Sequence, residues 1–322
     1  MKIRVIEAEY EDPYYNLAVE EAIPIAVGRG LVDPTLRFWR NRNAVVIGRF
    51  QCPELEVNLK LAAEKGVRVV RRFTGGGAVY HDMGNVNYAL SLRSEQNPDM
   101  RAYFEKVGSS VAAGLNRLAG PGFSYVPLND IAYKESKVSG LAASIGEGYI
   151  FVHGALLANV DLNLLSSVLR PPPEKFEGKA VRSVAKRVVN LSEIANRILS
   201  FEEIADAIIE GFKEVMGFEP YRAELSEEEK KIADQLYKEK YSTLDWSLGS
   251  LTLCPTTPEE RELIRKVSLG KRGDERGAHQ SNWVAKVKGG KIGKGIRILC
   301  PTGCGLGHDN GRLLHGTARG TR

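Results

Sequence analysis

Short runs rich in β-branched and aromatic residues alternate with helical apolar spacing over the first 250 residues. The strand-like runs lie at residues 3–10, 35–40, 44–50, 67–73 and 85–92. Helices are expected over 54–66 and 99–119, and after Asp12-Pro13, Ser200 and Ser226. Pro24 is expected to disturb the first of these helices. Gly146-Glu147-Gly148 separates two more strand patterns and predicts a hairpin. This order of elements indicates an α/β or α+β domain built on a sheet.

Charge is distributed unevenly along the 322 residues. Residues 251–322 carry 14 Lys and Arg against 6 Asp and Glu, a net of +8, whereas the first 250 residues have a net of −3. A body so close to neutrality argues against a protein that coats nucleic-acid phosphates. No stretch approaches the roughly 18 apolar residues of a membrane helix, and the N-terminus lacks a signal-peptide pattern. Four cysteines make no disulfide framework, so we expect a cytoplasmic protein.

Three consecutive glycines, Gly75–Gly77, stand in the segment RRFTGGGAVYHDMGNVNYAL, residues 71–90. A main chain without Cβ atoms passes close to a ligand, and its N–H groups form an anion-binding concavity. Arg71 and Arg72 precede the glycines, and because neighbours on a strand face opposite sides, only one is expected to reach the site. The spacing is neither that of a Walker loop nor that of a Rossmann loop. A bare triple glycine is more often a plain turn, but the two arginines and the HDxGNxN run favour a ligand site.

Two further segments place polar side chains among small neighbours. In NDIAYKESKVSG, residues 129–140, Lys137 is expected to project a compact positive charge into a cleft. Asn129 and Asp130 suit a ribose hydroxyl or a hydrated magnesium ion. His153 stands beside a glycine in an apolar strand pattern, YIFVHGALLANV, where the main chain permits close approach. Taken singly, the lysine also fits a solvated surface and the histidine a buried core.

Taken together and in this order, these segments resemble the lipoate–protein ligase A family. The similarity begins at NLAVEEAI (16–23), continues through IGRFQCPELEVN (47–58), and ends at KAVRSVAKRVVNLSEI (179–194). The resemblance covers roughly residues 1–250. It implies an α/β (α+β) domain of the class II synthetase and biotin ligase type, with a large mixed sheet flanked by helices. Residues 1–250 are therefore expected to be the catalytic domain and residues 251–322 a basic, glycine-rich C-terminal extension.

The resemblance implies an ATP-dependent reaction in two steps. The lipoate carboxylate attacks the α-phosphate of ATP and pyrophosphate leaves; a lysine of an acceptor domain then attacks the lipoyl-adenylate, giving an amide and AMP. Because the first step brings one anion up to another, main-chain N–H groups, a guanidinium and an ammonium would offset the repulsion. The resemblance makes Lys137 the catalytic residue, in contact with the lipoate carboxylate and the α-phosphate. Asp130, with Asn129, would assist in binding Mg2+ or the ribose, and Asp130 is the expected ligand of Mg2+.

The resemblance also carries over a set of binding residues and partners. ATP or lipoyl-AMP would contact Arg72, Gly75, Gly76, Gly77, Ala78, Val79, Tyr80, Asn129, Asp130, Lys137, Gly140 and His153. The lipoate pocket would be lined by Val79, His81, Val138, Val152 and Gly154, with Ala142 as a further candidate. The implied acceptors are lipoyl domains of 2-oxoacid dehydrogenase complexes or the glycine cleavage H protein. Relatives without the small C-terminal domain depend on a separate accessory subunit, and residues 251–322 do not match that domain.

Three alternatives remain at this point. Octanoyltransferases share the implied fold and use a catalytic cysteine without ATP, but no cysteine precedes Lys137 nearby and Cys52 does not match the position of that nucleophile. A non-catalytic nucleic-acid-binding protein would use the basic tail with Trp283, although aromatic residues are not interleaved with the basic ones. The tail also holds zinc-ligand types at Cys300, Cys304, His308 and His315. Their spacing fits the common structural zinc patterns poorly.

Overall fold

A computed structural model of the chain describes residues 1–170, 188–249, 254 and 256–269. By its contacts the chain divides into residues 1–275 and residues 276–322. The four zinc-ligand types of the basic tail and Trp283 lie outside the described residues.

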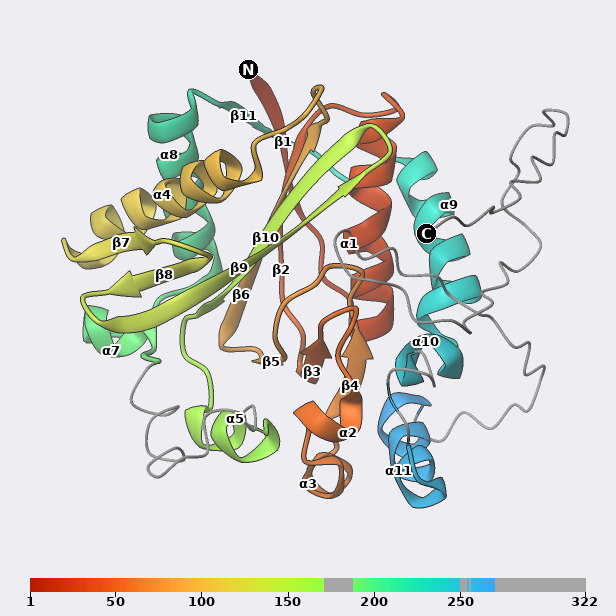
Figure 1. The fold of residues 1–322 in the computed structure, drawn as a ribbon. Helices are drawn as coiled ribbons and strands as arrows, with labels where there is room; N and C mark the ends of the chain where they lie inside the picture. The colour runs from red at the N-terminus through yellow and green to blue at the C-terminus, as the bar shows by residue number, and fades with distance from the viewer. Residues whose placement is uncertain (171–187, 250–253, 255, 270–322) are drawn as a thin grey trace, which may run out of the picture. The chain divides into compact units, whose positions relative to one another are not determined.

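The first unit is built on an eight-stranded mixed sheet with the order β11-β1-β2-β6-β10-β9-β8-β7 (Figure 1). Its strands are β1 (Lys2–Glu7), β2 (Thr35–Trp39), β6 (Asn85–Arg93), β7 (Phe123–Val126), β8 (Asp130–Tyr133), β9 (Ser136–Gly146), β10 (Tyr149–Leu157) and β11 (Glu219–Arg222). β1 pairs in parallel with β2 and β11, and the remaining neighbours are antiparallel. The predicted hairpin is therefore confirmed as β9 and β10.

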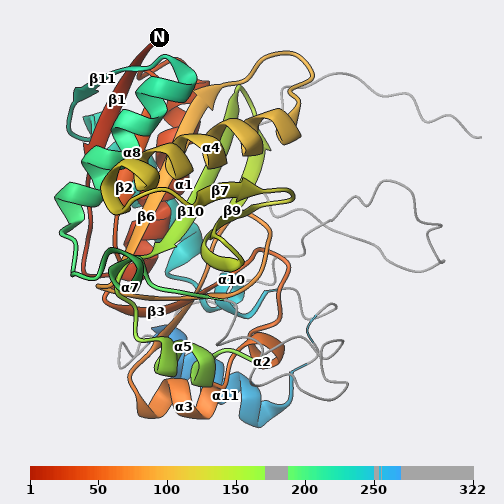
Figure 2. The ribbon, with the colours of Figure 1, turned by 90° about the vertical axis from the view of Figure 1, so that its left-hand side faces the viewer.

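Helices cover both faces of this large sheet. α4 (Met100–Ala119) and α8 (Phe201–Met216) pack on one face and close the main hydrophobic core (Figure 2). α1 (Pro13–Gly28) packs on the other face, beside α9 (Glu227–Leu236). A short helix, α7 (Leu191–Ala195), precedes α8. The helices expected after Ser200 and Ser226 both begin with a capping box, which satisfies main-chain donors that the first turn of a helix leaves free.

A second, three-stranded sheet has the order β4-β3-β5. It consists of β3 (Asn43–Ile47), β4 (Arg68–Arg71) and β5 (Val79–Asp82), with β4 parallel and β5 antiparallel to β3. One face packs against α3 (Leu59–Glu64), α5 (Leu162–Val168) and α11 (Pro258–Leu269). The opposite face packs against α1, so α1 lies between parts of both sheets. The triple glycine joins β4 to β5.

Two helices differ from the sequence expectation. The helix predicted over 54–66 is two pieces, α2 (Pro53–Glu56) and α3, because Val57 is extended and forms a β-bridge with Leu169. α1 runs through Pro24 to Gly28. Pro24 is buried in the packed face of this helix, so tertiary contacts on both sides of the proline keep it continuous.

The segment after α9 returns to the small sheet. A π-helical turn, η2 (Tyr237–Tyr241), leads to α10 (Leu244–Leu248), and α11 follows. Leu248, Ile264 and Val267 are buried in the core of the small sheet. The structure also closes a disulfide between Cys52 and Cys254, whereas the cysteine count led us to expect no disulfide framework. These residues are 202 positions apart, so only the folded chain brings them together.

Candidate active site

A cluster of buried polar side chains lies between α1, the large sheet and the small sheet. Its members are Asn16, Glu20, Arg37, Asn41, Arg72, Thr74, His81 and Asn87. Burying so many polar groups is costly unless each finds a partner. The hydrogen bonds that these side chains form determine how the glycine loop, residues 74–78, is held.

A chain of hydrogen bonds runs from α1 to the glycine loop. Glu20 accepts from Arg37 Nη1 at 3.0 Å and from His153 Nδ1 at 3.1 Å. His153 Nε2 lies 2.8 Å from Thr74 Oγ1, which accepts from Arg72 Nε at 2.9 Å. The Glu20 carboxylate accepts from His153 Nδ1, so in the neutral imidazole Nε2 is an acceptor and the Thr74 hydroxyl donates to it. This direction requires a neutral His153, and burial lowers the pKa of this imidazole while Glu20 opposes the shift.

Arg72 holds the glycine loop in its conformation through hydrogen bonds to the main chain of the loop. Its Nη2 donates to the carbonyl oxygens of Gly75 and Gly77 at 2.6 and 2.9 Å, and its Nη1 donates to the carbonyl of Val46. The side chain is only 5% exposed, and burial lowers its pKa to about 10. We expected Arg72 to bind the nucleotide; here its donors are engaged by the loop, so a direct phosphate contact stays a prediction. Because the carbonyl groups of Gly75 and Gly77 point toward Arg72, the N–H groups of the loop can point toward a ligand on the other side.

Gly76 has a conformation that side chains rarely adopt. Its φ is +93°, and a Cβ at this position would lie 2.8 Å from Arg72 Nη2. The neighbouring Gly75 and Gly77 have open space where a Cβ would be. The loop therefore needs glycine at Gly76 for its own geometry, while Gly75 and Gly77 leave room next to the main chain.

Arg71 faces away from this loop, as the alternation along a strand predicts. Its guanidinium donates to main-chain carbonyls of the segment 48–51 and of residues 246–248. Its role is therefore to fasten the C-terminal segment of the described chain to the segment that supports the glycine loop. Within the segment 48–51, the main-chain N–H of Arg49 donates to the Thr74 carbonyl at 2.8 Å and so supports the glycine loop.

Lys137 lies on β9 and pairs with Asp130 of β8, with 2.6 Å between Nζ and Oδ1. Both side chains are more than one-third exposed. A Cβ on Gly140 would lie 2.7 Å from the Lys137 ammonium, so the lysine side chain lies across this glycine. The sequence motif thus has a direct steric reason: Gly140 leaves the space that Lys137 occupies.

A β-bulge places Lys137 on the side of the sheet that carries the site. Ile131 pairs with Ser139 but Ala132 pairs with Lys137, so Val138 is an extra residue in β9. Residues three apart on a regular strand face opposite sides, and the bulge brings Lys137 and Gly140 onto the same side. Further along this face, a Cβ on Gly76 would lie 3.7 Å from the Cβ of Ala142. Ala142 is two residues from Gly140, about 7 Å along the strand.

The glycine loop and the Lys137 ammonium therefore border one surface of β9. Exposed main-chain N–H groups and a partly exposed ammonium are both donors to anions. The arrangement suits a ligand that presents two anionic groups to the loop and the lysine.

Asn129 holds the β8–β9 corner. Its Nδ2 donates to the Leu141 carbonyl at 2.9 Å, and Leu141 N donates to the Asn129 carbonyl at 2.7 Å. Asn129 thereby fixes the start of β8, where Asp130 faces Lys137. A direct contact of Asn129 with ribose or Mg2+ stays a prediction.

His81 lies in the polar cluster, whereas Tyr80 faces away from it. His81 Nδ1 lies 3.2 Å from Asn41 Nδ2, and burial, together with the charge of Arg72, lowers the pKa of the imidazole to about 3. The Tyr80 side chain is buried on the other face of the small sheet, where its hydroxyl donates to Asn43. Only the main chain of Tyr80 is placed to meet a ligand at the loop.

Three residues expected in the lipoate pocket lie on the opposite face of the large sheet. Val138 and Val152 are buried in the core with α4 and α8. A Cβ on Gly154 would collide with the Tyr88 hydroxyl, at 2.3 Å, so this glycine makes room for a core side chain. The physical reason is alternation, since Val152 and His153 are neighbours on β10 and face opposite ways. The pocket proposed below therefore does not include these three residues.

Several residues in the cluster or beside it were not predicted from the sequence as site residues. Glu20 and Trp39 both stand in the polar region between the sheets, and the ring of Trp39 packs edge-on against His81 at 6.0 Å. Trp39 Nε1 and Asn87 Nδ2 are buried donors for which the described residues offer no acceptor. The first of the two glutamates in NLAVEEAI, Glu20, is the one sequence signal, because an acid on the buried face of a helix needs a partner.

We expect Thr74→Val to weaken the site by removing the hydroxyl between Arg72 and His153. Losing one buried hydrogen-bonding group costs about 1–3 kcal/mol, so the rate of the first chemical step should fall roughly tenfold. Thr74→Ser keeps the hydroxyl and should restore most of the rate. Pyrophosphate release and thermal unfolding of both variants test this. Equal rates for the valine and serine variants would show that the hydroxyl has no such role.

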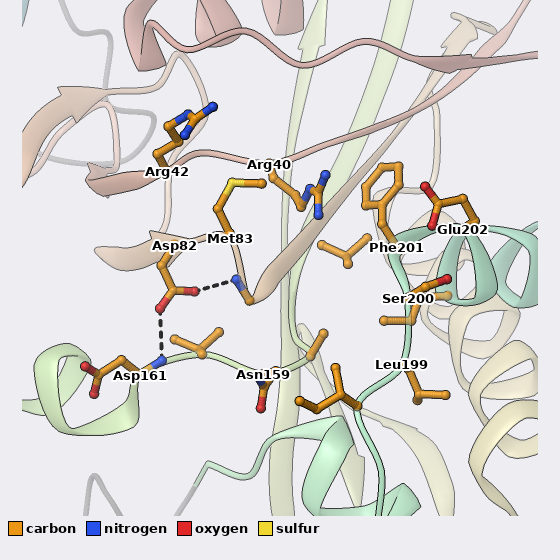
Figure 3. A pocket seen from close by; sticks show the side chains of 16 residues that line it. Arg40, Arg42, Asp82, Met83, Asn159, Asp161, Leu199, Ser200, Phe201 and Glu202 are labelled. Atoms are coloured by element: carbon orange, nitrogen blue, oxygen red, sulfur yellow. Dashed lines mark hydrogen bonds between the residues drawn. The ribbon is translucent and has the colours of Figure 1, made fainter.

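A separate cavity has a volume of about 910 Å³, and neither Lys137 nor the glycine loop belongs to its lining. Figure 3 shows the side chains that line this cavity. It is lined mainly by residues of the β5–β6 turn, of the segment 158–161 after β10 and of the start of α8. Asp82 accepts from the N–H groups of Gly84 and Asp161, and Arg40 pairs with Glu9. Because neither Lys137 nor the glycine loop lines this cavity, we do not place the reaction here.

Fold and site together define an α/β domain in which a glycine loop and a lysine border one surface of the large sheet. The sequence profile of the lipoyl protein ligase A/B catalytic domain matches residues 12–213. The chain is 36% identical over 245 residues to lipoate-protein ligase A subunit 1 of Thermoplasma acidophilum, covering 73% of this chain and 92% of that protein. The chain belongs to the lipoyl protein ligase A/B catalytic-domain family.

Solved structures show the same similarity. A bipartite lipoate protein ligase from Thermoplasma acidophilum, described with its E2 lipoyl domain, superposes with a TM-score of 0.71 at 34% identity, covering 77% of this chain and 97% of that one. A lipoate-protein ligase A bound with ATP superposes with a TM-score of 0.68 at 32% identity, covering 77% of this chain and 99% of that one. The expected fold, a large mixed sheet flanked by helices, is thus confirmed.

Proposed function

We propose that this chain is an ATP-dependent lipoate–protein ligase. Family membership supports the proposal, and so does a structure of a similar ligase with ATP. The observation that carries it is the shared surface of β9, bordered by the glycine loop and by Lys137. In the proposed first step, the lipoate carboxylate attacks the α-phosphate of ATP and pyrophosphate leaves. In the second, the ε-amine of an acceptor lysine attacks the lipoyl-adenylate, giving an amide and AMP.

Each group of the site has a proposed task in the first step. The N–H groups of Gly75–Gly77 and Ala78 bind phosphate oxygens, and Lys137 lies between the lipoate carboxylate and the α-phosphate. These donors offset the repulsion between two anions and stabilise the charge that develops in the transition state. Their fixed positions, held by Arg72 and Thr74, spare the reaction the cost of reorganising solvent.

The proposed lipoate pocket lies in the polar region next to α1. Val79, His81, Ala142 and His153 border it, and Trp39 supplies an apolar ring. Both imidazoles have lowered pKa values, so they are neutral at physiological pH and add no charge next to the acyl chain. A neutral lining suits an apolar chain that ends in one carboxylate.

Magnesium is a proposed companion of ATP. Asp130 supplies one partly exposed carboxylate, and Mg2+ is commonly held by one or two carboxylates together with substrate phosphates. The fit is partial, because Asp130 is engaged by Lys137 in this structure. When bound, the ion would neutralise phosphate charge, and Asp130 would be its ligand from this chain.

A thiol-dependent transfer is the weaker candidate. The two cysteines among the described residues, Cys52 and Cys254, are joined to each other. Neither lies in the β8–β9 segment that carries Lys137. The described part of the chain therefore offers no nucleophilic thiolate next to the proposed site.

Incubation with lipoate and ATP is expected to release pyrophosphate, with lipoate required for the release. The reason is that an adenylate forms only when the carboxylate displaces pyrophosphate. Octanoate transfer from an octanoyl carrier protein without ATP, and no pyrophosphate release, would instead identify an acyltransferase.

The proposed acceptor is a lipoyl domain of a 2-oxoacid dehydrogenase complex or the glycine cleavage H protein. One relative is named lipoate-protein ligase A subunit 1, and a similar bipartite ligase from Thermoplasma acidophilum is described with its E2 lipoyl domain. These names support a lipoyl-domain acceptor and a separate accessory subunit. None of the helices in the described parts of the chain has the length and apolar character for a bilayer crossing. A cytoplasmic location stays a proposal.

A further inference from the structure

Cys52, Glu54 and Cys254 form a buried cluster outside the proposed active site. One potential ligand atom from each, two sulfurs and one carboxylate oxygen, lie within 4.8 Å of one another. The three residues are 8%, 5% and 3% exposed. No other such group of three occurs among residues 1–170, 188–249, 254 and 256–269.

The Glu54 carboxylate is buried with one oxygen unpaired, which is unfavourable for the free energy of folding. Its Oε2 is buried, and no hydrogen-bond donor reaches it from the described residues. A carboxylate oxygen that is buried without a partner is unfavourable, and such a group points to a ligand, an ion or a redox role. The disulfide next to it offers no donor, whereas a metal ion held by both sulfurs would lie within its reach.

We propose that Cys52, Cys254 and Glu54 bind one Zn2+ ion when the disulfide is reduced. The Cα atoms of the cysteines are 5.3 Å apart. Two thiolates on one tetrahedral Zn2+ are separated by about 3.8 Å, since each Zn–S bond is about 2.3 Å long, and this backbone separation allows it. A carboxylate oxygen is the third ligand, and the fourth position is left to water.

The local charge favours both states of the cluster. Arg71 is buried nearby, and the charge of Glu54 counteracts the lowering of its pKa by burial. In the disulfide state, Arg71 and Glu54 balance each other. With two thiolates, the carboxylate, Zn2+ and Arg71, the formal charges again sum to zero. The cluster can therefore exchange a disulfide for a metal ion without leaving net charge buried.

The exchange is chemically balanced. A dithiol passes two electrons and two protons to the sulfurs, the Sγ–Sγ bond breaks, and the dithiol becomes a disulfide. Zn2+ then displaces both thiol protons into solvent as two Zn–S bonds and one Zn–O bond form. In the oxidised state the disulfide joins Cys254 to Cys52, and in the reduced state the Zn2+ ion joins them. Cys52 directly follows the segment 48–51, which supports the glycine loop.

Zinc titration of the full-length chain tests the proposal. The tail cysteines are first replaced, as Cys300→Ser and Cys304→Ser, so that only the cluster can supply thiolates. The protein is reduced with a dithiol, and the dithiol is then removed under anaerobic conditions. This reduced protein is expected to bind one Zn2+ per chain, whereas the oxidised protein is expected to bind none. Glu54→Gln should weaken binding at least about tenfold. Glu56→Gln, on the same short helix, is the matched control and should bind as the parent does.

A second measurement needs no variant of the cluster. Bound Zn2+ should protect Cys52 and Cys254 from alkylation in the reduced protein, measured peptide by peptide by mass spectrometry. Co2+ in place of Zn2+ should give the charge-transfer absorption of a thiolate ligand. Absence of zinc binding, no protection of the two cysteines, or equal affinity of Glu54→Gln and the parent would each overturn the proposal.

Discussion

Replacement of Lys137 by alanine is expected to slow lipoate-dependent pyrophosphate release about a hundredfold or more. The reason is electrostatic: a preorganised donor at the position of developing charge is worth on the order of 3 kcal/mol. Stability should hardly change, because the Lys137–Asp130 pair is more than one-third exposed and such pairs contribute little to folding. The measurement is the rate of pyrophosphate release at saturating ATP and lipoate, with thermal unfolding recorded alongside.

Lys134→Ala is the matched control for this experiment. Lys134 is exposed three residues earlier, and its ammonium lies 5.2 Å from the centre of the Tyr133 ring. The two variants change the net charge equally, so a shared effect would be one of charge alone. An unchanged rate in Lys137→Ala would remove this lysine from the chemistry.

Gly76→Ala is expected to distort the glycine loop and lower the same rate about ten- to a hundredfold. The substitution forces a side chain into a positive φ, which costs about 1–3 kcal/mol. The new Cβ would also press on Arg72 Nη2. Arg72 cannot move aside cheaply, because its donors hold Gly75, Gly77, Thr74 and Val46. Thermal unfolding and pyrophosphate release measure the two effects.

Gly77→Ala is the matched control, because it adds a side chain next to the ligand space without straining the main chain. A Cβ on Gly77 meets nothing within 4 Å, so this variant should unfold at the temperature of the parent protein. Its rate then reports only whether a ligand occupies the space next to the loop. If Gly76→Ala matched the parent in both unfolding and rate, the loop would not need its observed conformation.

The elements of the fold were largely predictable because local patterns specify them. Five strands of the central sheet (β1, β2, β6, β9 and β10) and the helix 100–119 follow from periodicity, and the helix starts after Ser200 and Ser226 follow from residue type. The remaining strands β7, β8 and β11 were not predicted. The helix expected over 54–66 was wrong because Val57 pairs with Leu169, a partner more than a hundred residues away. Long-range pairing of this kind leaves no trace in a local window.

The direction of side chains was less predictable than their type. The triple glycine and Lys137 were singled out from the sequence, but the bulge at Val138 sets which face Lys137 occupies. The same alternation sends Val138 and Val152 into the core, away from the proposed pocket. The role of Arg72 as a support for the loop depends on carbonyl positions that only the folded main chain defines.

The amino-acid order alone determined the alternating elements, the glycine loop with its arginines, and the lysine segment, because each is written in consecutive residues. The tertiary structure alone decided that Glu20, His153, Thr74 and Arg72 form one hydrogen-bonded chain, and that Cys52, Glu54 and Cys254 meet. Their partners come from distant parts of the chain. Such contacts form only when burial of apolar surface has brought those segments together.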